Sequence, residues 1–358
     1  MIDNSATFDI AGYGKYPVTH QPLSIETDSD SLRLTWDDGH ESEFHYLWLR
    51  DNCPCTSCVS SLTREQLFEI CDVPLSIRPV EAQLDRGYLH IQWDTDSHVS
   101  RFHPGWLRSH CYSEQAQAAR QWQPDIWDKD SITTRLARYD YADMMQNDAV
   151  LLDWLRKLRD SGISLLQNTD TTPGTLQQVA ARISFIRETN FGTLFDVCSK
   201  PDANTAAYTN LRLPLHTDLP TRELQPGLQF LHCLKNDASG GESILVDGFR
   251  IAEHMREQYP DDFEALSSLP MDFYNKDRNS DYRFRGPALV LDGQGTVIEV
   301  RFANFLRGPL DVPADQVMRH YRAYRTFISL TREPRFQFEY RLVPGDLLVF
   351  DNRRVLHA

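Results

Sequence analysis

The sequence has no long apolar run and no excess of positive charge, and both absences narrow its function. Its apolar stretches stay well short of the roughly 20 residues that a membrane-spanning helix needs. The opening residues, Met-Ile-Asp-Asn-Ser, lack the basic and apolar regions of a signal peptide. The formal net charge of -14 argues against a nucleic-acid partner, because phosphate binding takes clustered Lys and Arg. We therefore expect a cytoplasmic protein with no membrane or nucleic-acid partner.

Nucleotide-binding and serine-hydrolase signatures are also missing. The chain has no phosphate loop, no Gly-x-Gly-x-x-Gly fingerprint and no nucleophile elbow. The pair Gly240-Gly241 is too short for a nucleotide cradle and predicts a turn between strands. Only 7 cysteines occur, and three of them lie between Cys53 and Cys58. This crowding suits a reducing compartment and a metal better than a disulfide framework.

The N-terminal third contains an internal repeat. Each copy has a short apolar run ending in Trp, then a turn, then a second run ending in Trp-Leu-Arg. With one residue inserted in the second turn, His40 corresponds to His98 and Trp48 to Trp106. Both copies alternate apolar and polar residues around the turn, which predicts two β-hairpins. The copies span residues 32–50 and 89–108.

Three thiols within six residues, those of Cys53, Cys55 and Cys58, predict a structural zinc site. Such a site closes with four ligands, so a fourth must come from elsewhere in the chain. A redox role would need an exposed, activated thiolate, which no pattern here indicates. Spacing does not choose the fourth ligand, and the repeat even places a cysteine opposite Cys53. The candidates are His98, His103, His110 and Cys111.

Residues 125–140 are polar and charged without strand alternation, so we place a domain junction there. The sequence thus predicts a β-rich zinc-binding domain over residues 1–125 and a larger domain over residues 126–358. In the larger domain, Gly162 should end the first helix and Pro173 should lie in the first turn of the second. The expected helices cover residues 150–158, 172–183, 249–259 and 313–330, and the expected strands residues 163–166, 228–234 and 347–350.

Two histidines and one carboxylate predict an iron site in the larger domain. His216 and Asp218 are two residues apart in an expected extended segment, so their side chains should lie on the same side. His357 follows an apolar strand and a turn at Asp351-Asn352. Three such ligands on one face of a ferrous ion leave the opposite face open for oxygen and a chelating cosubstrate.

Four blocks in this order resemble the iron(II) and 2-oxoglutarate-dependent oxygenases, and within them the gamma-butyrobetaine hydroxylases. The blocks are residues 48–58, 215–220, 240–249 and 344–357. Periodicity alone indicates only mixed α and β structure. The resemblance covers nearly the whole chain and implies an α+β protein, with a double-stranded β-helix (jelly roll), flanking helices and a small zinc-binding N-terminal domain.

The resemblance also implies an activity and residue roles. The expected reaction is hydroxylation of gamma-butyrobetaine to L-carnitine by Fe(II), 2-oxoglutarate and O2, with succinate and CO2 released. The resemblance also implies a structural Zn(II).

The resemblance selects His98 as the fourth zinc ligand, because the family's zinc histidine precedes a segment like Ser100-Arg-Phe102. A quaternary ammonium group cannot donate a hydrogen bond, so aromatic faces should hold it. The implied contacts are Ser243 for 2-oxoglutarate and Phe191, Phe195, Tyr208 and Asn304 for the substrate.

One departure from the family pattern concerns the arginine that binds the distal carboxylate of 2-oxoglutarate. The family takes it from a position roughly a dozen residues past the second iron histidine. This sequence stops at Ala358, so we expect a truncated chain that lacks the last strand, this arginine and one cage aromatic. Arg307, Arg353 and Arg354 do not match that position.

Two other functions remain as alternatives. The protein could be an oxygenase acting on another trimethylammonium substrate such as trimethyllysine, since those enzymes share both metal motifs. It could also be a non-catalytic zinc-binding module that serves in assembly, although packing alone does not require the His216, Asp218 and His357 set. We further expect a homodimer, for which no residue pattern is specific.

Overall fold

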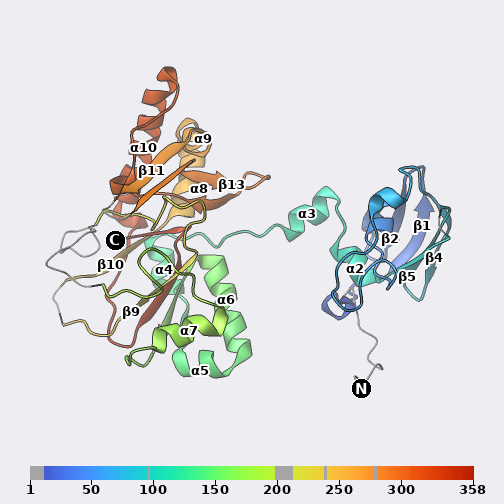
Figure 1. Cartoon of the computed structure of the whole chain (residues 1–358), viewed down its shortest axis with the longest axis horizontal. Helices are drawn as coiled ribbons and strands as arrows, with labels where there is room; N and C mark the ends of the chain where they lie inside the picture. The colour runs from blue at the N-terminus through green and yellow to red at the C-terminus, as the bar shows by residue number, and fades with distance from the viewer. Residues whose placement is uncertain (1–11, 96, 198–212, 238–239, 277–279) are drawn as a thin grey trace. The chain divides into compact units, whose positions relative to one another are not determined.

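The computed structural model describes residues 12–95, 97–197, 213–237, 240–276 and 280–358. The chain divides into two compact units, Met1–Trp122 and Gln123–Ala358, and each is described by itself (Figure 1). The junction that the sequence predicts lies between residues 125 and 126. Among the described helices, none is both long enough and apolar enough to cross a membrane.

The N-terminal unit contains the internal repeat as two three-stranded antiparallel sheets. Each sheet is followed by a short helix. The first copy comprises β1 (Pro22–Thr27), β2 (Ser31–Trp36), β3 (Glu41–His45) and α1 (Tyr46–Asp51). The second copy comprises β4 (Pro79–Asp85), β5 (Tyr88–Trp93), β6 (Val99–Phe102) and α2 (Pro104–Ser109), and α3 (Glu114–Arg120) follows it.

Both predicted hairpins are present, but their last residues are helical rather than extended. In the second copy Pro104 occupies the first helical turn, where its missing N–H is not needed. His103 caps the same helix by accepting a hydrogen bond from the Trp106 backbone N–H. The two copies share one core, in which the rings of Trp48 and Trp106 lie 5.4 Å apart.

The second unit is built on two sheets that pack face to face. The four-stranded sheet has the order β7-β8-β16-β9 and the three-stranded sheet the order β15-β10-β17. Apolar residues from both sheets, among them Leu165, Leu348, Leu245 and Phe338, form one buried cluster. The strands are β7 (Arg138–Asp140), β8 (Ile163–Gln167), β9 (Leu228–His232), β10 (Ser243–Asp247), β15 (Phe338–Tyr340), β16 (Leu347–Asp351) and β17 (Val355–His357).

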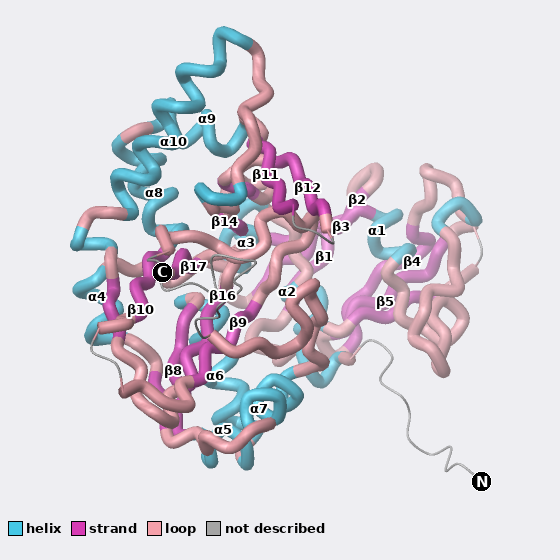
Figure 2. Tube along the Cα trace, turned by 60° about the vertical axis from the view of Figure 1, so that its left-hand side comes forward, coloured by secondary structure: helices cyan, strands magenta, loops and turns pink. Residues whose placement is uncertain are grey.

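Helices and two further hairpins surround these sheets (Figure 2). The helices α5, α6 and α7 cover the outer face of the four-stranded sheet, where Trp154, Leu158 and Val179 pack against Leu166 and Val349. The helices are α4 (Lys129–Arg135), α5 (Tyr141–Gln146), α6 (Asp148–Ser161), α7 (Thr175–Ile183), α8 (Gly248–Gln258), α9 (Pro260–Ser268) and α10 (Val317–Thr331). The hairpins are β11 (Met271–Lys276) with β12 (Asp281–Gly286), and β13 (Leu289–Leu291) with β14 (Val297–Val300).

The bounds of some helices differ from the predicted ones, and others agree with them. Helix α6 ends where expected, because Gly162 adopts a left-handed conformation with φ of 73°. Helix α7 begins only at Thr175, so Pro173 precedes the helix instead of lying in its first turn. Strand β9 lies within the expected strand at residues 228–234 and is partly exposed, since its first residue, Leu228, is 39% exposed. Helix α9 was not predicted, because its short apolar pattern follows α8 without a loop.

Candidate metal centres

The backbones of His216 and His357 are hydrogen-bonded to each other. His216 N donates to His357 O at 3.1 Å, and His357 N donates to His216 O at 2.9 Å. His357 ends β17, and His216 pairs with it as an isolated bridge outside the named strands. The extended segment expected before His216 begins in residues outside those described, and within the described part His216 is paired with β17. The bridge sets the two imidazoles side by side, with ring centroids 4.4 Å apart.

Asp218 completes a cluster of three ligand groups. Its Oδ1 lies 3.2 Å from His216 Nε2, and its Oδ2 lies 3.7 Å from His357 Nε2. The three ligand atoms all lie within 4.8 Å of one another. Two imidazole nitrogens and one carboxylate at this spacing are the donor set of non-haem iron(II) oxygenases. The structure thus brings together the three residues that the sequence singled out.

Each residue of the His216-Thr217-Asp218 motif is held by a different part of the unit. Beyond the bridge at His216, Thr217 N donates to Phe302 O at 2.7 Å, and Phe302 N donates to Thr217 Oγ1 at 3.0 Å. The Asn352 side chain pairs with the backbone of Asp218 in the same reciprocal way. Asp218 N donates to Asn352 Oδ1 at 2.6 Å, and Asn352 Nδ2 donates to Asp218 O at 3.0 Å.

Two further contacts orient the ligand atoms. His216 Nδ1 lies 2.9 Å from Pro214 O, and a carbonyl can only accept, so Nδ1 carries the proton and Nε2 is left for a metal. Gln229 Nε2 donates to Asp218 Oδ2 at 2.6 Å. Sequence reasoning missed both Gln229 and Asn352. A polar residue inside the apolar run 228–234 was the one signal for Gln229, and Asn352 was interpreted as an ordinary turn residue.

Electrostatics prepare the cluster for a cation. Burial alone raises the pKa of Asp218, but the neighbouring His357 and His216 outweigh it and hold the pKa well below its usual value. Burial lowers the pKa of His357, as does the nearby His216. Both effects keep the ligands in the forms that bind metal, a carboxylate and a neutral imidazole.

The predicted substrate residues are only partly described. Phe191 and Phe195 have ring centroids 6.2 Å apart, and Phe195 is 43% exposed, so they do not form a core face. Tyr208 lies outside the described residues. Asn304 is exposed, and its Oδ1 accepts a hydrogen bond from Tyr324. Its neighbour Phe305 meets the His216 ring edge-on at 5.1 Å, which puts this segment beside the cluster.

Ser243 begins β10 and faces the same side of its sheet as His357. Leu245 is the direct partner of His357 in the ladder, and alternate residues of a strand share a face. The three arginines weighed for the 2-oxoglutarate carboxylate have other partners. Arg354 forms a buried ion pair with Asp247 at 2.8 Å. Arg353 lies 3.4 Å from Asp351, and the Arg307 guanidinium lies 4.6 Å from the Tyr324 ring centroid.

In the N-terminal unit, His98 faces all three clustered thiols. Its Nε2 lies 3.2 Å from Cys53 Sγ and 3.6 Å from the Sγ atoms of both Cys55 and Cys58. Arg50 Nη1 also donates to Cys58 Sγ at 3.2 Å. The other candidates are engaged elsewhere: His103 caps α2, His110 Nδ1 contacts Trp106 O, and Cys111 lies against His40.

Two family models match this chain. Residues 128–358 match the "Taurine catabolism dioxygenase TauD, TfdA family" and residues 23–98 match "Gamma-butyrobetaine hydroxylase-like, N-terminal". The first match covers the jelly-roll sheets and the three iron-ligand candidates. The chain belongs to the TauD/TfdA dioxygenase family, and it is a 2-oxoglutarate-dependent dioxygenase with a jelly-roll fold.

Individual relatives point to one branch of this family. A gamma-butyrobetaine dioxygenase from Pseudomonas sp. (strain AK-1) is 51% identical over 350 residues, which cover 98% of this chain and 91% of the relative. The Homo sapiens gamma-butyrobetaine dioxygenase is 34% identical, covering 91% of this chain and 86% of its own length. The Homo sapiens mitochondrial trimethyllysine dioxygenase is 32% identical, covering 94% and 84% respectively.

Proposed function

We propose that this protein hydroxylates gamma-butyrobetaine to L-carnitine, with 2-oxoglutarate and O2 as cosubstrates. The observation that carries the proposal is the convergence of His216, Asp218 and His357 in a chain that is 51% identical to a gamma-butyrobetaine dioxygenase over 98% of its length. Five trimethyllysine dioxygenases that match the chain are less similar to it, at 28 to 33% identity. The complete triad also argues against a non-catalytic assembly module.

Iron(II) would be held by His216 Nε2, His357 Nε2 and one oxygen of Asp218. The chemistry that the bound ion supplies is insertion of one oxygen atom of O2 into a C–H bond, coupled to conversion of 2-oxoglutarate to succinate and CO2. The protein's own contribution is to fix the ligands. Gln229 holds the second Asp218 oxygen, and Pro214 O fixes the His216 tautomer.

Ser243 is our candidate contact for 2-oxoglutarate, because its side chain lies on the sheet face that also presents His357. For the substrate we keep Phe191, Phe195, Tyr208 and Asn304 as proposed contacts. A quaternary ammonium group would be held by aromatic faces, each contributing on the order of 0.5 to 2 kcal/mol. The pair Phe191 and Phe195 fits this role because Phe195 is exposed rather than packed in a core.

The test of the activity is oxygen consumption and succinate formation by purified protein with iron(II) and 2-oxoglutarate. We expect faster turnover on gamma-butyrobetaine than on trimethyllysine. His216→Ala should abolish turnover on both compounds while the N-terminal unit keeps its fold. Turnover of trimethyllysine alone would contradict the substrate assignment, and normal turnover by the His216→Ala variant would contradict the iron site.

We further propose that Cys53, Cys55, Cys58 and His98 hold a structural zinc ion. Burial raises the pKa of the Cys53 thiol to about 12 and also raises the pKa of the Cys58 thiol, whereas hydrogen bonds from Ser57 and Cys58 outweigh burial and lower the pKa of the Cys55 thiol. Zinc would deprotonate the three thiols, and tetrahedral zinc takes this donor set. We expect one tightly bound zinc per chain, with Zn–S distances of about 2.3 Å by X-ray absorption.

Cys55→Ala should impair folding of the N-terminal unit, whereas the exposed Cys71 can be changed to Ser without loss of zinc. Metal analysis of both variants checks this, and folded wild-type protein without zinc would contradict the proposal. The homodimer and the cytoplasmic location stay predictions, to be tested by light scattering and by cell fractionation.

A further inference from the structure

The internal repeat of the N-terminal unit extends to individual hydrogen bonds. Trp36 Nε1 donates to Ser42 Oγ, and its counterpart Trp93 Nε1 donates to Ser100 Oγ, each at 2.9 Å. The strands β1 and β4 carry a register shift at the same place, directly after their opening proline. Corresponding residues of the two copies therefore occupy equivalent positions, and features of one copy can be looked for in the other.

The proposed zinc ligands cross between the copies. His98 belongs to the second copy, and its Nε2 lies 3.2 Å from Cys53 Sγ, which follows the first copy. The counterparts of these two residues are His40 and Cys111, with the roles of the copies exchanged. His40 Nε2 lies 3.4 Å from Cys111 Sγ, so the second pair repeats the geometry of the first.

This distance indicates which kind of ion the second pair would fit. Zinc–nitrogen and zinc–sulfur bonds of about 2.0 and 2.3 Å at a tetrahedral angle put the two ligand atoms about 3.5 Å apart. Linear coordination with the same bonds would need about 4.3 Å. The 3.4 Å between His40 Nε2 and Cys111 Sγ therefore suits a four-coordinate ion of the zinc type.

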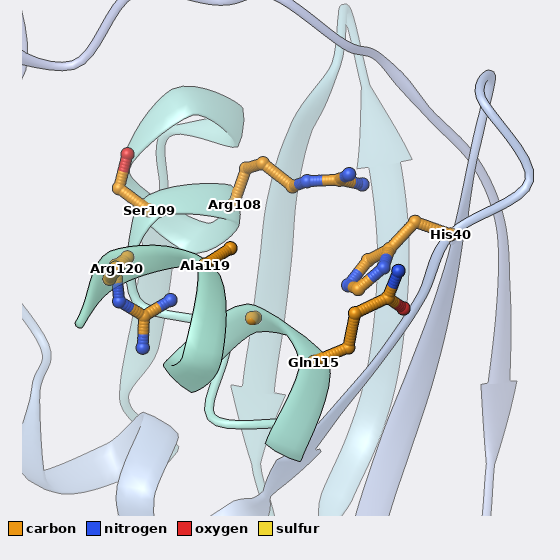
Figure 3. A pocket seen from close by; sticks show the side chains of 7 residues that line it. His40, Arg108, Ser109, Gln115, Ala119 and Arg120 are labelled. Atoms are coloured by element: carbon orange, nitrogen blue, oxygen red, sulfur yellow. The ribbon is translucent and has the colours of Figure 1, made fainter. Parts of the chain in front are cut away.

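The other two ligand positions are altered in the second copy. Counting along the repeat, Ser113 stands in place of Cys55 and Ala116 in place of Cys58. Ala116 and His40 both line a cavity of about 290 Å³, which Figure 3 shows beside the His40 imidazole. The cavity leaves room for water beside the His40 imidazole and Ala116.

An arginine is also repeated. Arg50 donates to Cys58 Sγ at 3.2 Å, and its counterpart is Arg108. With Ala116 in place of the third thiol, Arg108 instead binds Asp38 through two hydrogen bonds of 2.7 and 3.2 Å. The carboxylate of Asp38 neutralises the positive charge of Arg108 beside the cavity, so Arg108 repels a bound cation less than an unpaired arginine would.

We propose that His40 and Cys111 form a second, low-affinity site for a divalent ion of the zinc class, with water or Ser113 Oγ as further ligands. The inference rests on the proposed zinc cluster, whose geometry is its template. With one thiolate instead of three, the second site binds much more weakly than the cluster and exchanges its ion while the cluster keeps zinc. An ordinary S–H···N hydrogen bond is the alternative that the experiment must distinguish.

Cobalt(II) is the probe, because only a thiolate ligand gives it a sulfur-to-metal charge-transfer band in the near ultraviolet. Full-length protein with its tightly bound zinc is titrated with cobalt(II) without oxygen. The His216, Asp218 and His357 cluster has no thiolate, so cobalt bound there is silent in this band. We expect a saturable band of about one third of the intensity of a fully cobalt-substituted cluster, since one thiolate replaces three.

The variants Cys111→Ser and His40→Ala should lose this band. The matched control is Cys71→Ser, which removes an exposed cysteine of the same unit and should leave the band unchanged. A band that survives in Cys111→Ser, or no band in the wild type up to millimolar cobalt, would overturn the proposal. The amount of tightly bound zinc per chain is measured separately, and it tests the proposed cluster of Cys53, Cys55, Cys58 and His98 rather than the second site.

A gain of ligands gives an independent readout. The double variant Ser113→Cys/Ala116→Cys should rebuild a complete Cys3His set and hold two zinc ions per chain after dialysis, against one in the wild type. Adding His40→Ala to this background should return the content to one. A double variant that is folded by circular dichroism and still holds one zinc ion would show that the two positions are not equivalent and would overturn the inference.

Discussion

Replacing Asn352 by Ala should weaken iron binding, although Asn352 is not itself one of the three ligands. Its side chain is fully buried and makes three hydrogen bonds: two to the backbone of Asp218 and one, at 3.2 Å, from Nδ2 to Pro226 O. Each contributes a net 0.5 to 1.5 kcal/mol, roughly 1.5 to 4.5 kcal/mol in all. Because two of the three bonds fix Asp218 itself, the loss falls on the position of an iron ligand.

We therefore expect the dissociation constant for iron(II) to rise about 10- to 100-fold, the usual cost of losing a group that orients a ligand. The free energy of unfolding should fall by about 2 to 4 kcal/mol. Anaerobic iron titration in the presence of 2-oxoglutarate, followed by the visible absorption of the complex, measures the affinity. The iron dependence of oxygen consumption gives a second value.

The matched control is Asn147→Ala, which removes a helix cap far along the chain from the ligands. Asn147 Oδ1 accepts from Ala149 N at 2.9 Å at the start of α6, and losing such a cap costs about 1 kcal/mol. This variant should be less stable and bind iron normally. If Asn352→Ala binds iron with wild-type affinity, or if both variants lose affinity equally, Asn352 does not position Asp218.

Three further outcomes are expected. Gln229→Leu removes the donor to Asp218 Oδ2 and should lower iron affinity about 10- to 100-fold. Gln229→Glu should lower iron affinity less than Gln229→Leu does at acidic pH, because a protonated carboxyl group can still donate a hydrogen bond to Asp218. Iron titrations that give the same affinity for wild type and Gln229→Leu would contradict this role. Arg354→Met leaves Asp247 buried without its cation and should cost about 3 to 5 kcal/mol in urea unfolding, whereas unchanged stability would refute the role of the pair. The tert-butyl isostere of gamma-butyrobetaine keeps the shape but loses about 1 to 2 kcal/mol of cation–π attraction, so kcat/KM should fall about five- to thirtyfold, and Phe195→Leu should narrow that difference. Equal use of both compounds would contradict the aromatic cage.

Short-range patterns predicted the elements that have strong local signals. The left-handed Gly162 at the end of α6 and the two N-terminal hairpins follow from backbone preferences and from alternation of apolar residues. The helical end of the first copy was missed because Tyr46-Leu-Trp-Leu49 fits a strand as well as a short helix. The jelly roll itself came from the resemblance, since strand order depends on contacts between residues far apart in the sequence.

The candidate ligands were predictable because their residue types carry the chemistry. Histidine, aspartate and cysteine at ligand spacing are informative even without a structure. The residues that hold them were not predictable, since Asn352 and Gln229 act through hydrogen bonds to residues that are far away in the sequence. Nothing in a single sequence distinguishes an asparagine in a turn from one that pairs with a distant backbone.

The backbone bridge between His216 and His357 makes the proposed iron set depend on contacts between distant parts of the chain, unlike most of the proposed zinc set. Three of the four proposed zinc ligands lie within one short segment, so a newly made chain can capture zinc before its sheets have formed. The proposed iron set is split differently, because His216 and Asp218 are two residues apart but His357 lies far along the chain. The third ligand joins the other two through the bridge between His216 and His357, and His357 lies in β17, which pairs with β10. The complete three-ligand set for iron therefore depends on the folded second unit, whereas most of the proposed zinc set does not depend on contacts distant in sequence.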